Sequence, residues 1–251
     1  MAAASQANAY ALSAYPKLQA IYNKYNNTVN LLRTHAILQG VKCSTLLEDG
    51  FWDEDHQNMY DYCGDLGLGA IFLHRNGGLL NNMDIDCDGS SNGTLACEDD
   101  ETGQNQTSFG WLVAQYTNNK VKELDAQIHP YVVFGNVPDE KGSSPTFNPT
   151  DYGMVPLGVM AVVCNGQVHY GVWGDENAGT KTGEASLAMA KLCFPKDNLS
   201  GNVGHSANDV LYIGFRSEAS APKGANWAAK DAATFEGSIK KIGDSLVAGL
   251  K

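Results

Sequence analysis

The sequence predicts a mainly β fold with peripheral helices, an α+β arrangement within one domain. The chain has 251 residues, 43% of them hydrophobic, which is enough for one sizeable core or at most two modest ones. Short apolar runs recur along it, at 70–73, 131–134, 155–164, 167–173 and 210–215. Apolar residues at helical spacing lie mainly towards the two ends. We therefore expect a single domain over residues 1–251, with strands inside and helices around them.

The N-terminal region consists of a start without a recognisable secretion signal, a predicted helix and an acidic segment. Residues 1–10 lack the basic start and apolar run of a secretion signal, so we interpret them as a disordered or expression-derived beginning of a chain whose signal has been removed. Residues 10–35 carry apolar side chains at helical spacing, which predicts one helix or two short ones. The stretch 43–63 is rich in Asp and Glu and predicts an acidic, loop-rich segment held at its ends.

The middle of the chain alternates between apolar runs and polar connections. The run 70–73 is followed by the turn signal Asn76-Gly77-Gly78. Residues 84–107 are polar and acidic, which predicts a surface excursion. The next strand, 131–134, ends at Gly135-Asn136.

A hairpin and a terminal helix complete the predicted elements. Residues 155–164 and 167–173 read as two strands joined by Asn165-Gly166, a dipeptide that favours tight hairpin turns. Residues 210–215 predict a further strand. Apolar residues at i, i+4, i+7 and i+11 predict an amphipathic helix within 231–250: Phe235, Ile239, Ile242 and Leu246.

Cysteines and glycosylation signals indicate an oxidising compartment. The six cysteines are Cys43, Cys63, Cys87, Cys97, Cys164 and Cys193, and none lies in a CxxC pair, so three disulfides are favoured over reduced core thiols. Fifteen connectivities are possible, and pairing of neighbours in chain order is only a starting guess. Asn-x-Ser/Thr sequons stand at Asn26, Asn92, Asn105 and Asn198. We expect a secreted, extracellular protein.

The charge of the chain restricts its partners. The net charge is −11 and the pI is about 4.8, so nucleic acid is not an expected partner, because binding it requires a basic patch. No run reaches the roughly 18 apolar residues that a membrane span needs. An acidic surface attracts polycations, although secreted proteins are also acidic simply for solubility.

The segment from Gly174 to Ser186 carries the strongest candidate site. Asp175 follows an alternating apolar strand, and Glu184 precedes a helix-like run, with Thr182 as the expected N-cap. Two carboxyl groups across a cleft can split a glycosidic bond. The alternatives are an Asp that opens a turn and a Glu that opposes a helix dipole. That dipole would lower the pKa of Glu184, whereas a general acid needs it raised, by burial or by a like charge such as Glu176.

Two other acidic segments are candidates for binding. Asp84-Ile85-Asp86-Cys87-Asp88-Gly89 resembles the start of a calcium loop, but loop position 12 is Leu95 where an EF-hand requires Glu. A hydrogen-bonded acidic turn, or a negative wall for a cationic ligand, is therefore favoured. Asp125 and His129 are either substrate contacts or polar residues of a strand. No histidine pair has ligand spacing, and we expect no metal or cofactor.

The chain resembles fungal secreted chitosanases of glycoside hydrolase family 75. The matching blocks are Gly50–Trp52, Met83–Gly89, Glu123–Asn136 and Val172–Ser186, within a family core of about 40–215. The resemblance implies endo-hydrolysis of β-1,4-linked glucosamine in chitosan with inversion, and it places the catalytic Asp and Glu on Asp175 and Glu184. It also implies a β-barrel core, of the double-psi type, in a monomer.

The resemblance also suggests which residues contact the substrate. The expected substrate-binding residues are Asp84, Asp86, Asp125, His129, Tyr131, Trp173 and Glu176. Trp52, Trp173 and Tyr131 are candidates for stacking on a sugar, with packing in the core as the equal alternative for each. We assign Glu184 as general acid and Asp175 as the base that activates water, roles that the dipole argument leaves exchangeable. Two alternatives remain at this point: a non-hydrolytic polysaccharide-binding or wall-loosening protein, and a calcium-dependent lectin-like module on the turn at 84–88.

Overall fold

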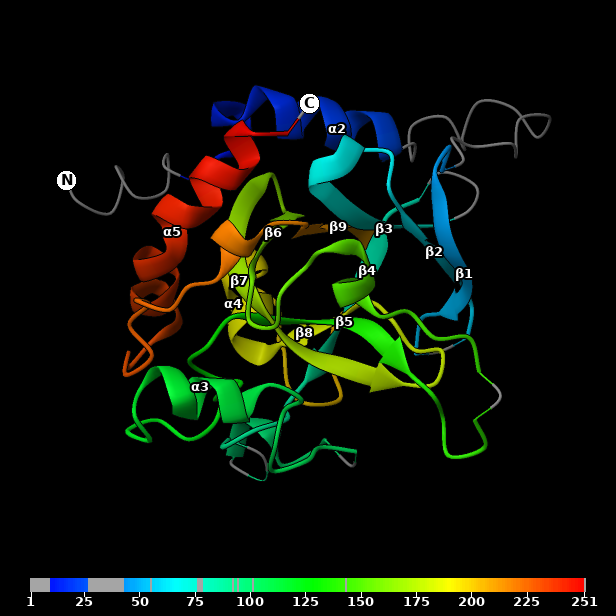
Figure 1. Cartoon of the computed structure of the whole chain (residues 1–251). Coiled ribbons are helices and arrows are strands. Elements are labelled where there is room, and N and C mark those ends of the chain that lie inside the picture. Colours follow the sequence, from blue (N-terminus) through cyan, green and yellow to red (C-terminus); the bar gives the residue numbers. More distant parts are fainter. Residues whose placement is uncertain are drawn as a thin grey trace.

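In the part of the chain that the structure describes, nine strands of a single mixed sheet form the centre of the molecule (Figure 1). The computed structural model describes residues 10–26, 43–54, 56–75, 79–91, 93, 95–100, 102–142 and 144–250. Its strands are β1 (Leu46–Trp52), β2 (Met59–Cys63), β3 (Ala70–Arg75), β4 (Asn81–Asp86), β5 (Tyr131–Val137), β6 (Val159–Cys164), β7 (Gln167–Ala178), β8 (Glu184–Ser186) and β9 (His205–Phe215). Its α-helices are α2 (Pro16–Tyr25), α3 (Gly110–Tyr116), α4 (Leu187–Cys193) and α5 (Ala232–Ala248). Short 3-10 turns lie at Leu12–Ala14, Gly67–Gly69, Leu95–Cys97, Pro149–Tyr152 and Glu218–Ser220.

The strand order closes part of the sheet on itself. The order is β1-β2-β3-β9-β4-β8-β5-β7-β6, and β9 also pairs with β6, so that six strands from β9 to β6 form a ring. Within the ring β4–β8 and β5–β7 are parallel, and the other pairings are antiparallel. The predicted mainly β fold with surrounding helices is confirmed at this level.

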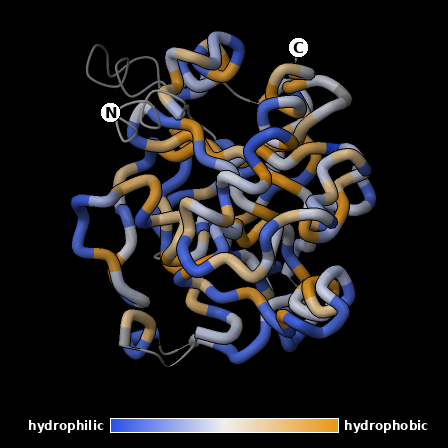
Figure 2. Tube along the Cα trace, turned by 90° about the vertical axis from the view of Figure 1, so that its left-hand side faces the viewer, coloured by the Kyte–Doolittle hydropathy of each residue, from blue (hydrophilic) through white to orange (hydrophobic). Residues whose placement is uncertain are grey.

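The central hairpin forms as its sequence predicts. Every residue of β6 is buried, as expected for a continuous run of Val, Met and Ala inside a ring of strands. Asn165 and Gly166 both have positive φ, 46° and 70°, which is the geometry of the tight turn that matches the twist of a hairpin. In Figure 2 hydrophilic colours mark many of the outer loops, while hydrophobic stretches run through the interior.

Helix α5 packs against β6 and β7 through the predicted apolar stripe. Asp231 caps it by accepting a hydrogen bond from the Thr234 amide at 2.8 Å. Phe235 and Ile239 are fully buried. The same face also buries a carboxylate that the stripe did not predict, Glu236.

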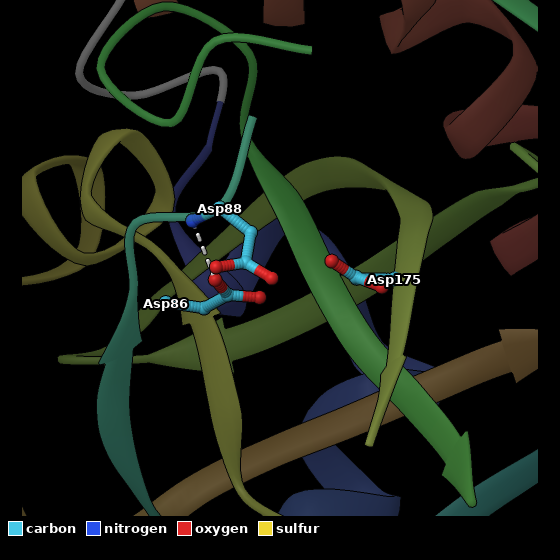
Figure 3. A group of neighbouring side chains, drawn as sticks. All are labelled: Asp86, Asp88 and Asp175. Atoms are coloured by element: carbon cyan, nitrogen blue, oxygen red, sulfur yellow. Dashed lines mark hydrogen bonds between the residues drawn. The ribbon is translucent and has the colours of Figure 1, made fainter. Parts of the chain in front are cut away.

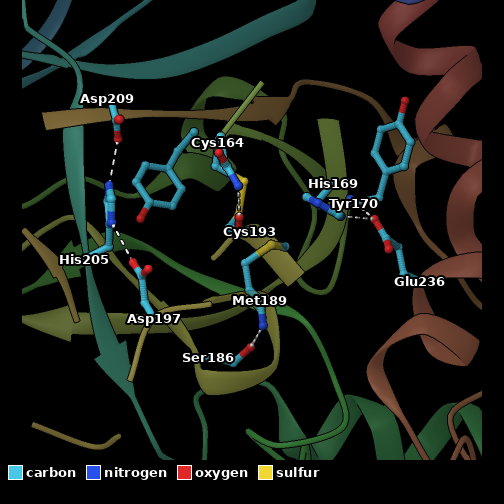
Figure 4. Close-up of a disulfide and its surroundings, with 12 residues drawn as sticks. Cys164, His169, Tyr170, Ser186, Met189, Cys193, Asp197, His205, Asp209 and Glu236 are labelled. Carbon is cyan, nitrogen blue, oxygen red and sulfur yellow. Dashed lines mark hydrogen bonds and ion pairs between the residues drawn. A yellow bond between two sulfur atoms is a disulfide. The ribbon is translucent and has the colours of Figure 1, made fainter. Parts of the chain in front are cut away.

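Glu236 ties α5 to β7 through a buried polar contact (Figure 4). Its Oε1 lies 3.0 Å from His169 Nδ1 and accepts a hydrogen bond from the Tyr170 amide at 2.9 Å. Only 2% of Glu236 is exposed, and 5% of His169. A carboxylate this deeply buried must keep its partners, because water cannot replace them.

Glu236→Ala is expected to lower the free energy of unfolding by about 3 kcal/mol, because it strands a buried imidazole and a buried amide. Urea unfolding followed by circular dichroism measures this. The control is Lys241→Ala on the exposed side of the same helix, which should stay within about 0.5 kcal/mol of the parent. Equal stabilities of the two variants would contradict a stabilising role for the contact.

Three disulfides pair the cysteines in chain order: Cys43–Cys63, Cys87–Cys97 and Cys164–Cys193. The starting guess for the connectivity is therefore confirmed. The first disulfide closes the segment that was expected to be held at its ends. The last joins the end of β6 to the end of α4 (Figure 4).

Several predicted loops are strands. The acidic stretch 43–63 contains β1 and β2, whose pairing is interrupted by register shifts that weaken the alternation in the sequence. The predicted excursion at 84–107 begins inside β4, where Met83 and Ile85 are buried and alternate with Asp84 and Asp86. That period of two is a strand signal, which the resemblance to a calcium loop obscured.

Some predictions lie wholly or partly outside the described residues. Helix α2 confirms the first part of the predicted N-terminal helical region, whereas residues 27–35 are not described. Residues 1–9, the predicted turn at 76–78 and the sequon at Asn92 also lie outside the described residues. No helix among the described residues combines the length and apolar character required to cross a membrane.

Candidate active site

Three carboxylates share one face of the strands β4 and β8. The two strands run parallel, with Asp84 opposite Glu184 and Asp86 opposite Ser186. Side chains alternate along a strand, and matched residues of neighbouring strands point to the same side. Asp84, Asp86 and Glu184 therefore project together, although about 100 positions separate the two segments.

The chain turns sharply after β4 and brings Asp88 beside Asp86. The Asp88 amide donates to Asp86 Oδ1 at 2.7 Å, and the Gln104 amide donates to Asp88 Oδ1 at 2.6 Å. The Tyr131 hydroxyl donates to the carbonyl oxygens of Asp86 and Asp88, at 3.2 and 3.0 Å. Gly89 has φ +104°, and a Cβ there would lie 2.4 Å from a neighbouring carbonyl oxygen, so only glycine fits. This is the hydrogen-bonded acidic turn that the sequence favoured over an EF-hand.

A β-bulge turns Asp175 towards this acidic turn. The register of β5 against β7 shifts at Gly174, so that Trp173 and Asp175 are matched to consecutive residues of β5. Such a bulge redirects a side chain without ending the strand. The predicted strand end at Asp175 is therefore wrong, because β7 continues to Ala178. Figure 3 shows the Asp175 carboxyl directed towards those of Asp86 and Asp88.

The two oxygens of Asp175 have different surroundings. Oδ1 accepts hydrogen bonds from the Ser108 amide at 3.0 Å, the Ser108 hydroxyl at 2.5 Å and the Glu176 amide at 2.8 Å. Oδ2 is buried and has no hydrogen-bond partner among the described residues. One oxygen therefore fixes the orientation of the carboxylate, and the other is free for a ligand or a water.

Glu184 lies on a strand and not on a helix. It opens β8, and the N-cap of α4 is Ser186, whose hydroxyl accepts a hydrogen bond from the Met189 amide at 3.2 Å. The prediction that Thr182 caps this helix is wrong. Because Glu184 lies before the helix and not in its first turn, the expected lowering of its pKa by the helix dipole no longer applies. The Glu184 Oε2 instead accepts a short hydrogen bond from the Asn177 side-chain amide.

Asp175 and Glu184 line the same cavity, of about 310 Å³. This is within the range of small-molecule sites. Among the described residues, its wall contains six carboxylates and one cationic side chain. The lining residues are Ile85, Asp86, Asp88, Asp100, Thr102, Gln104, Val133, Asp175, Glu176, Asn177, Ala178, Lys181 and Glu184.

Burial raises the pKa of the carboxyls contributed by β4 and its turn. The pKa of Asp84 rises to about 7, with burial as the main cause. Burial also raises the pKa of Asp88 to about 7. The pKa of Asp86 lies well above its usual range because of burial and the charges of Asp175 and Asp88. Part of this cluster therefore stays protonated at mildly acidic pH.

The pKa of each of the two candidate catalytic carboxyls is also raised by burial, against opposing contacts. For Asp175 the hydrogen bonds from Ser108 and the Glu176 amide oppose the rise in pKa. For Glu184 the main opposing influence on the pKa is the ammonium group of Lys181. The two carboxyls thus differ in what favours their ionised form: hydrogen bonds for Asp175, and the charge of Lys181 together with the Asn177 hydrogen bond for Glu184.

Asp84→Asn is expected to stabilise the protein at pH 8 relative to the parent, but not at pH 4. The pKa of Asp84 is about 7 in the folded protein and about 3.9 in an unfolded chain, so the folded state binds more protons between these values. Its contribution to stability therefore falls as the pH rises from about 4 to about 7, and the amide variant escapes that loss. Urea unfolding at both pH values measures the difference. Asp49→Asn, at an exposed position on β1, is the control, and an Asp84→Asn effect equal at both pH values would contradict the argument.

Two aromatic residues expected at the substrate are buried behind the site. Tyr131 and Trp173 have no exposed surface, so neither has a ring face to offer a sugar. The Trp173 ring packs edge-on against Phe109 at 4.8 Å, and its Nε1 donates to the Asp175 carbonyl oxygen at 3.1 Å. Both side chains instead hold the backbone of the acidic residues in place.

The segment 123–131 does not supply the expected polar contacts. The Asp125 amide donates to His129 Nδ1 at 2.8 Å, in a turn where a strand was predicted. His129 Nε2 lies 3.0 Å from the Trp227 carbonyl oxygen, and the imidazole is 3% exposed. Asp125, His129 and Trp52 do not line the cavity, whereas Asp86 and Glu176 do. Asp84 belongs to the same carboxylate face.

The structure adds residues that the sequence did not single out. Asn177 and Lys181 lie within the segment 174–186, so their proximity to Glu184 was accessible in principle. Ser108 and Gln104 have no sequence signal, because they reach the site through loop packing. Asp88 was visible as part of the acidic motif but was not assigned to the site.

Three carboxylates in the cavity form a possible cradle for a cation. One oxygen from each of Asp86, Asp88 and Asp175 lies within 4.8 Å of the other two (Figure 3). Oxygen ligands of this kind suit a hard divalent ion, and they equally suit an ammonium group with its three N–H donors. A pair of carboxyls held in such a cavity can exchange protons with a bound molecule.

Comparison with known proteins identifies close relatives. Residues 83–249 match the family described as fungal chitosanase of glycosyl hydrolase group 75. The match therefore includes α5, beyond the expected core of 40–215. An endo-chitosanase B of Aspergillus oryzae (strain ATCC 42149 / RIB 40) is 52% identical over 215 residues, covering 84% of this chain and 86% of that protein. An endo-chitosanase of Aspergillus fumigatus is 51% identical over 233 residues, covering 92% of each.

Proposed function

The chain belongs to the fungal chitosanases of glycosyl hydrolase group 75, and we propose that it hydrolyses β-1,4 linkages between glucosamine residues within chitosan, with inversion at the anomeric carbon. The observation that carries this proposal is the presence of Asp175 and Glu184 in one cavity among further carboxylates. Relatives about half identical in sequence are named endo-chitosanases and match most of this chain.

Asp175 acts as the general base. Three donors on Oδ1 fix its orientation, and the free Oδ2 can accept a proton from a water. The water then attacks the anomeric carbon from the face opposite the leaving oxygen. Burial raises the pKa of the neighbouring Asp86 and Asp88, so that both can carry a proton, whereas the three donors on Asp175 oppose the rise of its pKa.

Glu184 acts as the general acid. Burial favours its protonated form, and the Asn177 amide holds one oxygen so that the other can present the proton. Proton transfer to the glycosidic oxygen lets the leaving sugar depart as an alcohol. An inverting arrangement requires the two carboxyls to be about 6.5–9.5 Å apart, which leaves room for the water between them. Their origin on separate strands, β7 and β8, is compatible with that gap.

The carboxylates that do not take part in proton transfer bind the substrate. Chitosan carries an ammonium group on each glucosamine, and Asp86 and Asp88 offer oxygens for one of them beside Asp175. Asp84 and Glu176 extend the negative wall. The net charge of −11 also attracts the polycation over a longer range.

Added salt is expected to lower kcat/KM on chitosan, because the Debye length shrinks from about 30 Å at 0.01 M to about 10 Å at 0.1 M. Initial rates measured between these salt concentrations test this, with circular dichroism at each concentration to check that the fold is unchanged. Rates that do not depend on salt would contradict electrostatic attraction of the polymer.

A reducing-end assay on soluble chitosan tests the proposed activity directly. We expect new reducing ends, a rapid fall in viscosity from internal cleavage, and an α-anomer as the first product seen by proton NMR. No release above background would overturn hydrolysis, and a β-anomer as the first product would overturn inversion.

The two alternatives make different predictions. A wall-loosening protein on this scaffold would need an acidic groove but not both carboxyls, and it would release no sugar. A calcium-dependent lectin built on the turn after β4 would lose chitosan binding in EDTA. We expect EDTA to leave both binding and hydrolysis unchanged.

We further propose that the ring of six strands is a β-barrel of the double-psi type, supported by the two parallel pairings within it. We propose that the enzyme acts outside the cell, where its three disulfides are stable. We propose that it works as a monomer, which light scattering of the purified protein can test.

A further inference from the structure

Lys181 is the single cationic side chain among the described residues that line the cavity. It lies in the loop between β7 and β8, which connects the two proposed catalytic carboxyls. Its Nζ is 2.9 Å from Glu54 Oε1 and 3.6 Å from Glu184 Oε1. The ammonium group is therefore shared between a carboxylate outside the cavity and one inside it, and it is closer to the outer one.

The backbone of this loop is held from both sides. The Trp52 amide donates to the Thr180 carbonyl oxygen at 2.8 Å, and the Thr182 amide donates to the Trp52 carbonyl oxygen at 2.9 Å. The Asn136 side-chain amide donates to the Lys181 carbonyl oxygen at 2.7 Å. Because the main chain is held in place, the ammonium group can move between its two partners only through side-chain rotation.

The position of the Lys181 ammonium group between Glu54 and Glu184 determines how easily Glu184 keeps a proton. An ammonium group close to a carboxylate favours the ionised form, which a general acid cannot use. Glu54 is about half exposed, and it attracts the ammonium group away from the cavity at little desolvation cost. Lys181 nevertheless stays close enough to Glu184 to move towards it if the charge of Glu54 is removed.

We propose that Glu54 and Lys181 are positioning residues that tune Glu184: Glu54 draws the Lys181 ammonium group outward and thereby keeps Glu184 protonated until it has transferred its proton to the leaving sugar. This rests on the proposed function, in which Glu184 is the general acid. Neither residue touches the reacting atoms in this account.

Other groups also face Glu184, and one of them, Asp84, is itself affected by the charge of Glu54. These groups come from each element around it: Tyr62 on β2, Asp84 and Asp86 on β4, Asp88 in the turn after β4, Asn177 on β7 and Tyr212 on β9. The pKa of Asp84 and that of Asp88 are both about 7, so these two groups titrate in the pH range of the test in every variant. Because the same groups are present in every variant, differences between variants report the change at Glu54 or Lys181 together with its effect on these neighbours.

The test is the pH dependence of kcat/KM on chitosan for Glu54→Gln, Lys181→Met and the double variant. Loss of the general acid's proton sets the alkaline limb. Glu54→Gln should move that limb to lower pH by about one unit, because the ammonium group then turns to Glu184. Lys181→Met should move it to higher pH, and the double variant should follow Lys181→Met. The titration of the substrate's own amines is the same for every variant.

Matched controls carry the same charge changes at exposed positions, Glu140→Gln and Lys141→Met. Both should reproduce the parental profile. Lys181→Arg keeps the charge and should return the limb to within a few tenths of a pH unit of the parent. Thermal melts of all variants identify any that fail to fold, and the Glu54→Gln profile alone then decides, since that side chain is about half exposed and its loss leaves no cavity in the core.

Shifts of the limb in the same direction for Glu54→Gln and Lys181→Met would overturn the proposal. So would an unmoved limb with a reduced kcat, which would indicate a merely structural role. Failure here leaves the proposed function standing as long as Glu184→Gln remains inactive. An active Glu184→Gln variant would overturn the proposed function itself.

Discussion

Glu184→Gln is expected to lower kcat on chitosan by about 10³-fold with no loss of fold, because an amide cannot protonate the glycosidic oxygen. The substitution is isosteric, and the contact with Asn177 can persist through the side-chain oxygen of the glutamine. Initial rates of reducing-end release measure the effect. A glucosamine oligomer bearing an aryl leaving group of low pKa provides the decisive comparison, because such a group departs without protonation. The variant should therefore recover most of its rate on the aryl substrate.

The matched control for this experiment is Glu98→Gln, an exposed carboxylate outside the cavity, which should keep the parental rate. If Glu184→Gln lost as much activity on the aryl substrate as on chitosan, Glu184 would not be the acid. If it kept a near-normal rate on chitosan, it would have no part in proton transfer.

Asp175→Asn is expected to lower kcat by a similar factor of about 10³, on both the polymer and the aryl substrate. The base activates water whatever the leaving group, so a better leaving group does not compensate for its loss. The Ser108 and Glu176 donors can still bind the asparagine oxygen, which should preserve the fold. Rates on the two substrates, with a thermal melt of the variant, measure these expectations.

Azide separates the two roles further. An anionic nucleophile that needs no base should restore part of the activity of Asp175→Asn and release a glycosyl azide of inverted configuration. It should have no such effect on Glu184→Gln. Rescue of Glu184→Gln and not of Asp175→Asn would show that the assigned roles must be exchanged.

Ser108 offers a graded version of the same argument. Ser108→Ala removes one donor to Asp175 Oδ1 but leaves the backbone amide in place. Its effect on kcat should therefore be clearly smaller than that of Asp175→Asn. This residue has no sequence signature as a site residue, and its role follows from its place before α3.

Much of the local structure could be predicted from the sequence. The hairpin at Asn165-Gly166, the apolar stripe of α5 and the buried strand β6 were predicted correctly, because each depends on neighbours within a few positions. Where signals competed, prediction was poorer. The strand β4 alternates Met83 and Ile85 with aspartates, but the same aspartates resemble a calcium loop.

The candidate site divides in the same way. The segment 174–186 already contained both proposed catalytic carboxyls together with Asn177 and Lys181. Its contact with Asp86 and Asp88 depends on the pairing of β8 with β4, about 100 positions away. The burial of Tyr131 and Trp173 likewise depends on which side of the ring their strands present. Aromatic and acidic residue types alone do not distinguish a wall of the site from its support.

Residue types and short spacings in this chain thus predict the α+β class and the family, and they single out the pair of carboxyls that we propose as catalytic. Only the three-dimensional arrangement shows which acids face one another and which aromatic rings are buried away from the cavity. It also shows the position of Lys181, which is the only ammonium group among the described residues that line the cavity. The physical reason is the distance along the chain over which the stabilising contacts act. Turns and helical stripes are stabilised by contacts within a few residues, whereas the charge and solvation of Asp175 and Glu184 are set by strands that meet only when the ring closes.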